Sequence, residues 1–142
     1  MIDPGRILGG PVQRKTLVAL VVFAAAALPA AASAGAIDLR ITYRASPSAA
    51  PRIFTLHCTP PAHGTVPRPV AACTRLIAIG DGAFAPTKRG MRACSQIYGG
   101  PQTVTVTGTY FGRPVWAKLS RTDGCALARW NRVAFLFPSL SS

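Results

Sequence analysis

Four cysteines behind an apolar N-terminal segment constrain this chain of 142 residues more than any other feature of its sequence. In an exported domain of this size cysteines are usually paired, because the export route is oxidising. Four cysteines allow three pairings. The spacing favours Cys58 with Cys73 and Cys94 with Cys125, because each pair then closes a loop within its own half of the domain. We therefore expect a small domain stabilised by two disulfides.

The N-terminus has the three parts of a secretory signal in order. Arg14 and Lys15 form a positively charged start, an apolar run extends from Leu17 to Leu28, and Ala32-Ser33-Ala34 offers a cleavage site. The run is about a dozen residues, whereas a membrane-spanning helix needs about 20. A buried core helix and an uncleaved anchor are the alternatives. We predict a removable signal peptide over residues 1–34, which leaves a secreted, extracellular protein with no membrane attachment.

The single mature domain predicted over residues 35–142 is strongly basic. Removing the signal takes three of the 16 basic residues and one of the 4 acidic residues, so 13 and 3 remain and the formal charge is near +10. Such a charge favours acidic partners, so a cationic extracellular binding module is one hypothesis for the function. The basic residues are scattered, however, and Lys88-Arg89 is their one adjacent pair. A nucleic-acid partner is not expected, because no basic run with interleaved aromatic residues occurs.

The sequence contains little catalytic equipment. The mature chain has three aspartates, no glutamate and two histidines. The aspartates lie in different segments, and neither His57 nor His63 has an obvious acidic partner nearby in sequence, so no catalytic pair is indicated. A zinc site would need closely spaced ligands such as C-x-x-C, and none occurs. We expect no enzyme activity, no metal and no cofactor, with His57 on a strand surface and His63 in a turn.

The pattern of apolar and polar residues predicts an α+β fold. Ile37, Leu39, Ile41 and Tyr43 alternate with polar residues, which is the period-two pattern of a strand with one buried face. The predicted strands cover residues 37–43, 52–58, 103–107, 115–119 and 133–137, and the predicted helices run from 69 to a stop at Gly80 and from 125 to 130. Five strands and two helices in separated order make an α+β sandwich the expected architecture.

Proline, glycine and charge mark the connecting segments. Residues 60–69 are expected to form a rigid, proline-rich loop without a ladder of backbone hydrogen bonds. In the helix that follows, Val70, Cys73 and Ile77 are expected to share one face. Residues 81–93 lack a sustained period and are expected to be an exposed loop.

Two blocks of the mature sequence carry a specific pattern when they are taken together. The first is Leu56-His57-Cys58-Thr59-Pro60, then Gly64-Thr65, Pro67, Pro69 and Ala71-Ala72-Cys73. The second is Ala93-Cys94-Ser95-Gln96-Ile97-Tyr98, then Thr103 to Tyr110, Gly112-Arg113-Pro114-Val115, Cys125 and Val133 to Phe137. Together they resemble the streptomyces subtilisin inhibitor family of secreted protease inhibitors. The resemblance implies a five-stranded antiparallel sheet with two helices, the disulfides Cys58–Cys73 and Cys94–Cys125, and a two-fold homodimer.

The resemblance also implies a partner, a subtilisin-like serine protease, which is inhibited by a substrate-like loop from about Arg92 to Gly99. The resemblance implies a scissile bond between Gln96 and Ile97, with Gln96 in the primary specificity pocket of the protease. The reactive-site residues carried over are Ala93, Cys94, Ser95, Gln96, Ile97, Tyr98 and Gly99.

The chemistry of such a loop has a physical basis. An extended segment adds its backbone to a protease cleft as an extra strand, so binding depends on main-chain hydrogen bonds. A bridge at Cys94 removes part of the ordering cost before binding, and it holds the new chain ends together after a cut. Cys94 is therefore predicted to serve affinity as well as stability.

Four positions depart from the common pattern of the family. Ser95 stands where proline is common, and Gln96 replaces the usual Met, Lys or Arg. Gly99-Gly100-Pro101 is one residue longer than the usual Asp-Pro, and the two glycines add backbone freedom. Asp123 stands where an asparagine often supports the loop, and a carboxylate lacks the amide donor.

Overall fold

The structure, a computed structural model, describes residues 5, 10, 35–87 and 93–138. Within these residues, five antiparallel strands form one sheet in the order β3-β2-β1-β4-β5, and two disulfides link Cys58 to Cys73 and Cys94 to Cys125. The strands are β1 (Asp38–Arg44), β2 (Arg52–His57), β3 (His63–Gly64), β4 (Gly100–Tyr110) and β5 (Arg113–Arg121); the helices are α1 (Pro69–Ile79) and α2 (Gly124–Val133), with the 3-10 turns η1 (Gly80–Gly82) and η2 (Ala134–Leu136). The predicted fold class and both disulfide pairings are confirmed.

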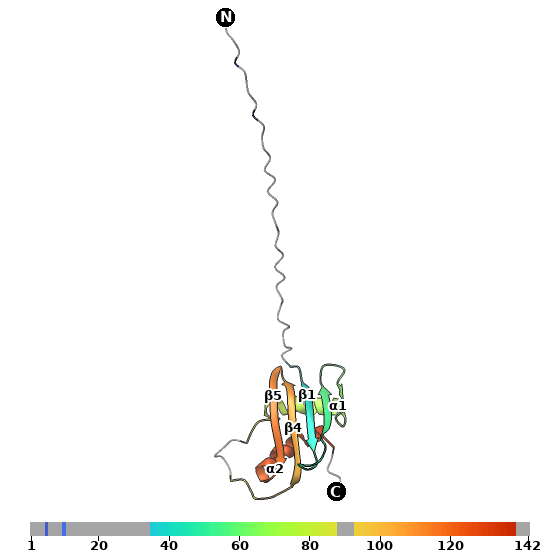
Figure 1. Ribbon diagram of the computed structural model, residues 1–142, viewed down its shortest axis with the longest axis vertical. Coiled ribbons are helices and arrows are strands. Elements are labelled where there is room, and N and C mark those ends of the chain that lie inside the picture. Colours follow the sequence, from blue (N-terminus) through green and yellow to red (C-terminus); the bar gives the residue numbers. More distant parts are fainter. Residues whose placement is uncertain (1–4, 6–9, 11–34, 88–92, 139–142) are drawn as a thin grey trace. The chain divides into compact units, whose positions relative to one another are not determined.

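The sheet is built outward from β1, whose alternating sequence predicts a strand with one buried face. Ile41 lies opposite Phe54 of β2 on one side and Val106 of β4 on the other, and all three side chains are buried. Figure 1 shows β1, β4 and β5 side by side, with the tight turn at Phe111–Gly112 between the last two. Because side chains alternate along each strand, one face of the sheet receives the whole apolar set.

Both helices contribute to the core on that apolar face. Their buried residues, Ala72, Cys73, Leu76, Trp130 and Val133, belong to one cluster with the inward residues of the strands. The opposite face of the sheet is open, and Trp116 on β5 is 71% exposed there. Among the described residues, no helix is long and apolar enough to span a membrane.

Helix α1 has the predicted limits but a different buried face. Pro69 occupies the first turn, where its missing N–H is not needed, and Gly80 ends the helix at φ 68. Val70, Cys73 and Ile77 were expected to share one face, but only Cys73 is buried. It is buried with Ala72 and Leu76, whereas Val70 and Ile77 are exposed. The prediction was wrong because apolar residues occur all around this helix, so the periodicity alone does not fix its orientation.

The proline-rich segment contains a short strand that the sequence analysis missed. His63 and Gly64 pair with His57 and Leu56 as strand β3 at the edge of the sheet. The expectation that residues 60–69 form no β-sheet hydrogen bonds was wrong. The prolines lie on either side of His63 and Gly64 and leave these two residues free to pair.

The C-terminal apolar run is not a strand. Val133 ends α2, Ala134–Leu136 forms η2, and Val133, Leu136 and Phe137 are buried. A short apolar run fits a buried strand and a buried helical turn equally well, which explains the error. The sheet reaches five strands through β3 instead.

The expected exposed loop over residues 81–93 is partly buried. Asp81 is exposed, but Ala83 and Phe84 are buried, and the Phe84 ring meets the edge of the Tyr110 ring with centroids 5.1 Å apart. Two apolar residues between glycines gave no periodic signal, so their anchoring role was not visible in the sequence. Residues 88–92 of this segment lie outside the described residues.

Candidate functional site

The candidate site is the segment that leads into β4. The residues predicted as the reactive site, except Gly99, are all exposed: Ala93, Cys94, Ser95, Gln96, Ile97 and Tyr98. None of them lies in a helix or strand, and Ile97 and Tyr98 are 60% and 63% exposed. Two large apolar side chains in open solvent bury little area within the domain, so this segment makes few contacts of its own with the core. Arg92, the predicted start of the loop, lies outside the described residues.

A disulfide fixes the N-terminal side of this segment to α2. Cys94 is joined to Cys125 with a Cα–Cα distance of 5.3 Å, and Cys125 lies in the first turn of the helix. Asp123 caps that helix, because its Oδ1 accepts a hydrogen bond of 2.9 Å from the backbone N–H of Ala126. The Asp123 carboxylate therefore stabilises the helix to which the loop is attached.

Two backbone hydrogen bonds hold the segment on either side of its centre. The N–H of Gly124 donates to the carbonyl of Ser95 at 2.9 Å, and the N–H of Gly99 donates to the carbonyl of Arg121 at 2.7 Å. The anchors on the domain, Arg121 and Gly124, lie only three residues apart, where β5 leads into α2. Between the anchored residues, no hydrogen bond among the described residues involves positions 96–98. Residues 93–99, called the arch below, thus form a short exposed segment. Both ends of the arch are attached to the connection between β5 and α2.

The two glycines at the end of the arch fill a tight space. A Cβ on Gly99 would lie 2.5 Å from Cδ2 of Leu127, and Gly100 has φ 131, a conformation that L side chains rarely adopt. The Arg121 guanidinium donates a hydrogen bond of 2.8 Å to Oε1 of Gln102 beside them. The glycines, which add freedom in an isolated chain, here allow close packing against β5 and α2.

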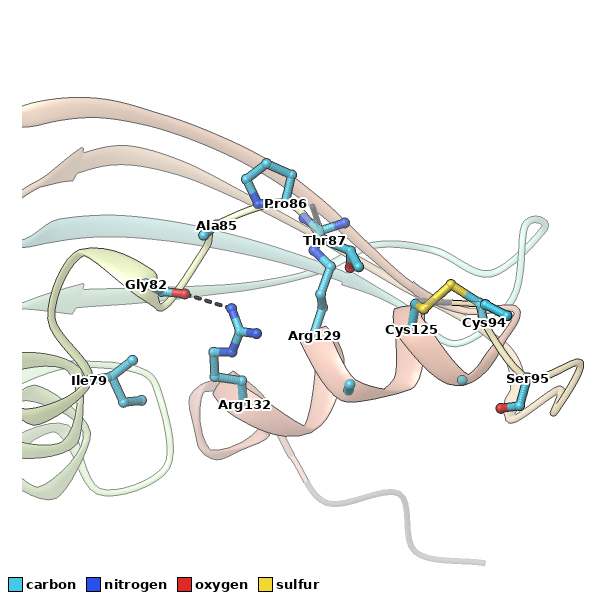
Figure 2. Close-up of a pocket in the computed structure, with 13 residues that line it drawn as sticks. Ile79, Gly82, Ala85, Pro86, Thr87, Cys94, Ser95, Cys125, Arg129 and Arg132 are labelled. Atoms are coloured by element: carbon cyan, nitrogen blue, oxygen red, sulfur yellow. Dashed lines mark hydrogen bonds between the residues drawn. A yellow bond between two sulfur atoms is a disulfide. The ribbon is translucent and has the colours of Figure 1, made fainter. Parts of the chain in front are cut away.

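A cleft of about 710 Å³ lies beside Cys94 and Ser95, at the N-terminal end of the arch. Figure 2 shows it between the Gly82–Thr87 segment and α2, with the Cys94–Cys125 bridge and Ser95 at one end. Arg132 donates a hydrogen bond of 2.7 Å across it to the carbonyl of Gly82. Cys94 and Ser95 therefore border this cleft, and the covalent bridge and the Ser95–Gly124 hydrogen bond connect them to α2.

The structure brings together some polar residues that the sequence leaves apart. Nδ1 of His57 lies 3.1 Å from Oδ2 of Asp38, because the β1–β2 register places the two residues opposite each other. Sequence analysis missed this pair, and the only signal for it would have been the strand register. Asp123 lies near the sulfurs of Cys94 and Cys125, but those sulfurs are bonded to each other and provide no thiolate for a metal.

These observations define a class of protein: a small disulfide-linked α+β domain with an exposed loop that is anchored at both ends. Residues 33–121 match the model of the family described as subtilisin inhibitor-like, and the chain belongs to this family. Membership confirms the resemblance seen in the sequence and the expectation of a protease inhibitor that is not an enzyme. It does not favour the cationic binding module.

Individual relatives from Streptomyces species are similar to this chain. The chain is 34% identical over 121 residues to "Trypsin inhibitor STI2" of Streptomyces longisporus, with 80% of this chain and 83% of the relative covered. It is 34% identical over 86 residues to "Probable subtilase-type protease inhibitor" of Streptomyces avermitilis, with 61% and 59% covered. It is also similar to Streptomyces caespitosus sermetstatin in a crystal structure with Bacillus licheniformis subtilisin, with 30% identity, 70% of this chain and 97% of that chain covered, and a TM-score of 0.45.

Proposed function

We propose that this protein is a secreted inhibitor of subtilisin-like serine endopeptidases and that it binds them with the arch formed by residues 93–99. The observation that carries the proposal is that residues 96–98 are exposed between Ser95 and Gly99, which are both hydrogen-bonded to the domain. An extended, exposed backbone with free donors and acceptors can pair with a protease cleft as an added strand. Its family membership and the subtilase-type relative support the choice of target.

The anchors explain how such a loop inhibits and is not consumed. In the proposal the protease attacks the carbonyl of Gln96 and the scissile bond is Gln96–Ile97. After a cut, the acyl side remains attached through the Cys94–Cys125 bridge and the Ser95–Gly124 hydrogen bond. The leaving-group side remains attached through the Gly99–Arg121 hydrogen bond and strand β4. The new amine stays beside the acyl carbon, so reformation of the peptide bond competes with release.

The side chains of the arch indicate the target preference. Gln96 is uncharged, so it offers no ion pair to a protease pocket that selects Lys or Arg. The similarity to a protein named as a trypsin inhibitor therefore does not by itself transfer trypsin inhibition to this chain. Ile97 and Tyr98 supply apolar area on the leaving-group side. A subtilisin-like enzyme with a permissive primary pocket is the target we expect.

Titration of purified subtilisin and trypsin with the protein tests the proposal. We expect stoichiometric inhibition of subtilisin and slow cleavage between Gln96 and Ile97, which mass spectrometry detects. Gln96→Lys should shift inhibition towards trypsin, and Gln96→Gly and Gln96→Pro should weaken inhibition of subtilisin. Thr59→Lys is the control: it adds the same charge at an exposed residue just after β2, at the opposite end of the sheet from the arch. Equal inhibition by all Gln96 variants would contradict the assignment of the loop.

The export of the protein is part of the proposal. Its support is the order of charged start, apolar run and small-residue cleavage site over residues 1–34, together with the use of all four cysteines in disulfides. N-terminal sequencing of the protein from culture medium should begin near residue 35. Recovery only from the cytoplasm with the N-terminus intact would contradict it.

A homodimer is the proposed assembly. Its support is the open face of the sheet, where Ile53 and Trp116 are exposed large apolar residues. Light scattering should give twice the chain mass, and Trp116→Lys should convert the protein to a monomer without loss of inhibition. A monomer at all concentrations would exclude the dimer and leave the inhibitory loop unaffected.

A further inference from the structure

Two histidines far from the arch lie side by side at the edge of the sheet. His57 at the end of β2 is directly opposite His63 in β3. Their rings stack with centroids 4.8 Å apart and an interplanar angle of 16°. The sequence contains two histidines in total, and the β2–β3 pairing brings them together.

Both rings have the same nitrogen engaged by an acceptor. Nδ1 of His57 lies 3.1 Å from Oδ2 of Asp38, and Nδ1 of His63 lies 2.9 Å from the carbonyl oxygen of Pro61. A carbonyl or carboxylate oxygen only accepts, so the proton of each neutral imidazole is on Nδ1. Each Nε2 is then left with an unshared lone pair. This arrangement, in which Nδ1–H donates to a carboxylate or carbonyl, is the usual state of a metal-binding histidine.

We propose that His57 and His63 bind one divalent transition-metal ion, such as Zn²⁺ or Cu²⁺, through their two Nε2 atoms. Imidazole nitrogens suit these ions, whereas Ca²⁺ and Mg²⁺ require oxygen ligands. Water completes the coordination. Asp38 is a positioning residue, because its carboxylate orients His57 and does not touch the metal.

Binding of one ion requires the two rings to reorient, because the lone pairs of stacked rings run nearly parallel. Each metal–nitrogen distance must be about 2.0–2.1 Å, so the stacked rings have to tilt until their lone pairs converge on one point. Rotation about the Cβ–Cγ bond of histidine is soft. Neither ring is enclosed, since the His57 side chain is 37% exposed and His63 is exposed, so solvent and an ion reach both.

The proposed metal site is separate from the proposed inhibitory loop. Asp38 lies opposite Thr109 near the end of β4, whereas the arch enters β4 at Gly100. Nine residues at about 3.3 Å each place the two sites about 30 Å apart along the strand. The two proposals can therefore fail independently.

Isothermal titration of the purified, disulfide-bonded protein with ZnCl₂ and with CuSO₄ tests the proposal. We expect saturable binding of one equivalent, tighter for Cu²⁺ than for Zn²⁺, and no comparable binding of Mg²⁺. His57→Ala and His63→Ala should each abolish it. Asp38→Asn, which keeps both ligands, should weaken it about 10- to 100-fold. Asp81→Asn makes the same charge change at another exposed aspartate and should leave the affinity unchanged.

Nuclear magnetic resonance identifies the ligand atoms. Zinc should shift the ring signals of both histidines in fast or slow exchange, and the ring nitrogen shifts should identify Nε2 as the bound atom. The circular dichroism spectra and melting temperatures of the His57→Ala and His63→Ala variants should match the wild type, which shows that they fold, and inhibition of subtilisin should stay at the wild-type value. Binding that survives either histidine substitution, binding equal in the Asp38→Asn and Asp81→Asn variants, or no saturable binding would each overturn the proposal.

Discussion

The two disulfides of this domain are alike in chemistry and differ in surroundings. Cys58–Cys73 joins the end of β2 to α1; Cys73 is buried in the core, and Cys58 packs against it. Cys94–Cys125 joins the arch to the start of α2, with Cys94 exposed and Cys125 half-buried. Their Cα–Cα distances, 5.5 and 5.3 Å, are nearly the same. One bridge is packed against the core, and the other lies at the surface beside the proposed inhibitory loop.

Loop length does not account for the difference in role. The bridges close segments of 15 and 31 residues. On the chain-entropy model the shorter loop contributes about 3 kcal/mol and the longer one slightly more, so both stabilise the fold to a similar degree. What distinguishes the second bridge is its position next to residues 95–98, where it limits the conformations of an exposed backbone. The comparison predicts that stability and inhibition can be separated by removing one bridge at a time.

The largest effect is expected from Cys94→Ala with Cys125→Ala. Without this bridge, binding must order three exposed side chains, at about 0.5–1.5 kcal/mol each, which weakens inhibition roughly 10- to 1,000-fold. The cut ends are also released, so the protein should become a substrate. Inhibition constants at a temperature where circular dichroism shows a folded variant, and mass spectrometry of the cleaved chain, measure both effects.

Removal of the other bridge, Cys58→Ala with Cys73→Ala, is the matched comparison. We expect the free energy of unfolding to fall by about 3 to 5 kcal/mol, because the chain entropy and buried packing are both lost. Urea titration measures this loss. At low temperature, where the variant is folded, its inhibition constant should remain near the wild-type value. If both double variants lose inhibition equally when folded, the division of roles is wrong.

The sequence could predict these strands and bridges for specific reasons. Residues 37–43 and 103–107 alternate strictly, and the cysteine spacing left one compact pairing. The failures occurred where two structures satisfy the same pattern. Residues 133–137 are apolar enough for a strand, but they follow α2 directly and turn as η2 against the core. The prediction for the face of α1 was wrong because Val70 and Ile77 are apolar without being buried.

The candidate site was partly visible in the sequence and partly not. The family pattern located residues 93–99, and the position of Cys94 indicated a tether. The second set of anchors, the backbone groups of Arg121 and Gly124, depends on how β5 meets α2, and no side-chain pattern encodes it. The His57–His63 pair was missed in the same way, because β3 is only two residues long.

Alkaline pH should act on the half of the domain that contains the first bridge. Burial, with a smaller contribution from the charge of Asp81, raises the pKa of Tyr110 to about 12. Its hydroxyl donates towards the carbonyls of Leu76 and Gly80, at 3.0 and 2.7 Å, at the end of α1. The folded state therefore favours the neutral phenol. Its contribution is complete below the ordinary pKa of about 10 and is lost as pH rises through about 12.

Because the pKa of Tyr110 is about two units above its ordinary value, this loss is at most about 3 kcal/mol in the free energy of unfolding. Urea titrations between pH 9 and 12, for the protein and for Tyr110→Phe, measure the effect. The variant should be about 1 kcal/mol less stable at neutral pH, and its stability should fall less steeply above pH 10. Tyr98→Phe, which changes an exposed tyrosine, should leave the slope unchanged. Parallel slopes for all three proteins would show that Tyr110 does not carry the effect.

The smallest expected effect concerns the Ser95–Gly124 contact. A Cβ on Gly124 would fall on the Oγ of Ser95, so Gly124→Ala should displace Ser95 and lengthen the 2.9 Å hydrogen bond. Loss of one such bond costs about 1 kcal/mol, which corresponds to a five- to tenfold weaker inhibition.

Ser95→Ala removes the obstructing oxygen and keeps the carbonyl. In a double-mutant cycle, Gly124→Ala should therefore weaken inhibition less in the Ser95→Ala background. Gly82→Ala, where a Cβ meets nothing within 4 Å, is the control, and strictly additive effects would show that this end of the arch does not depend on the contact.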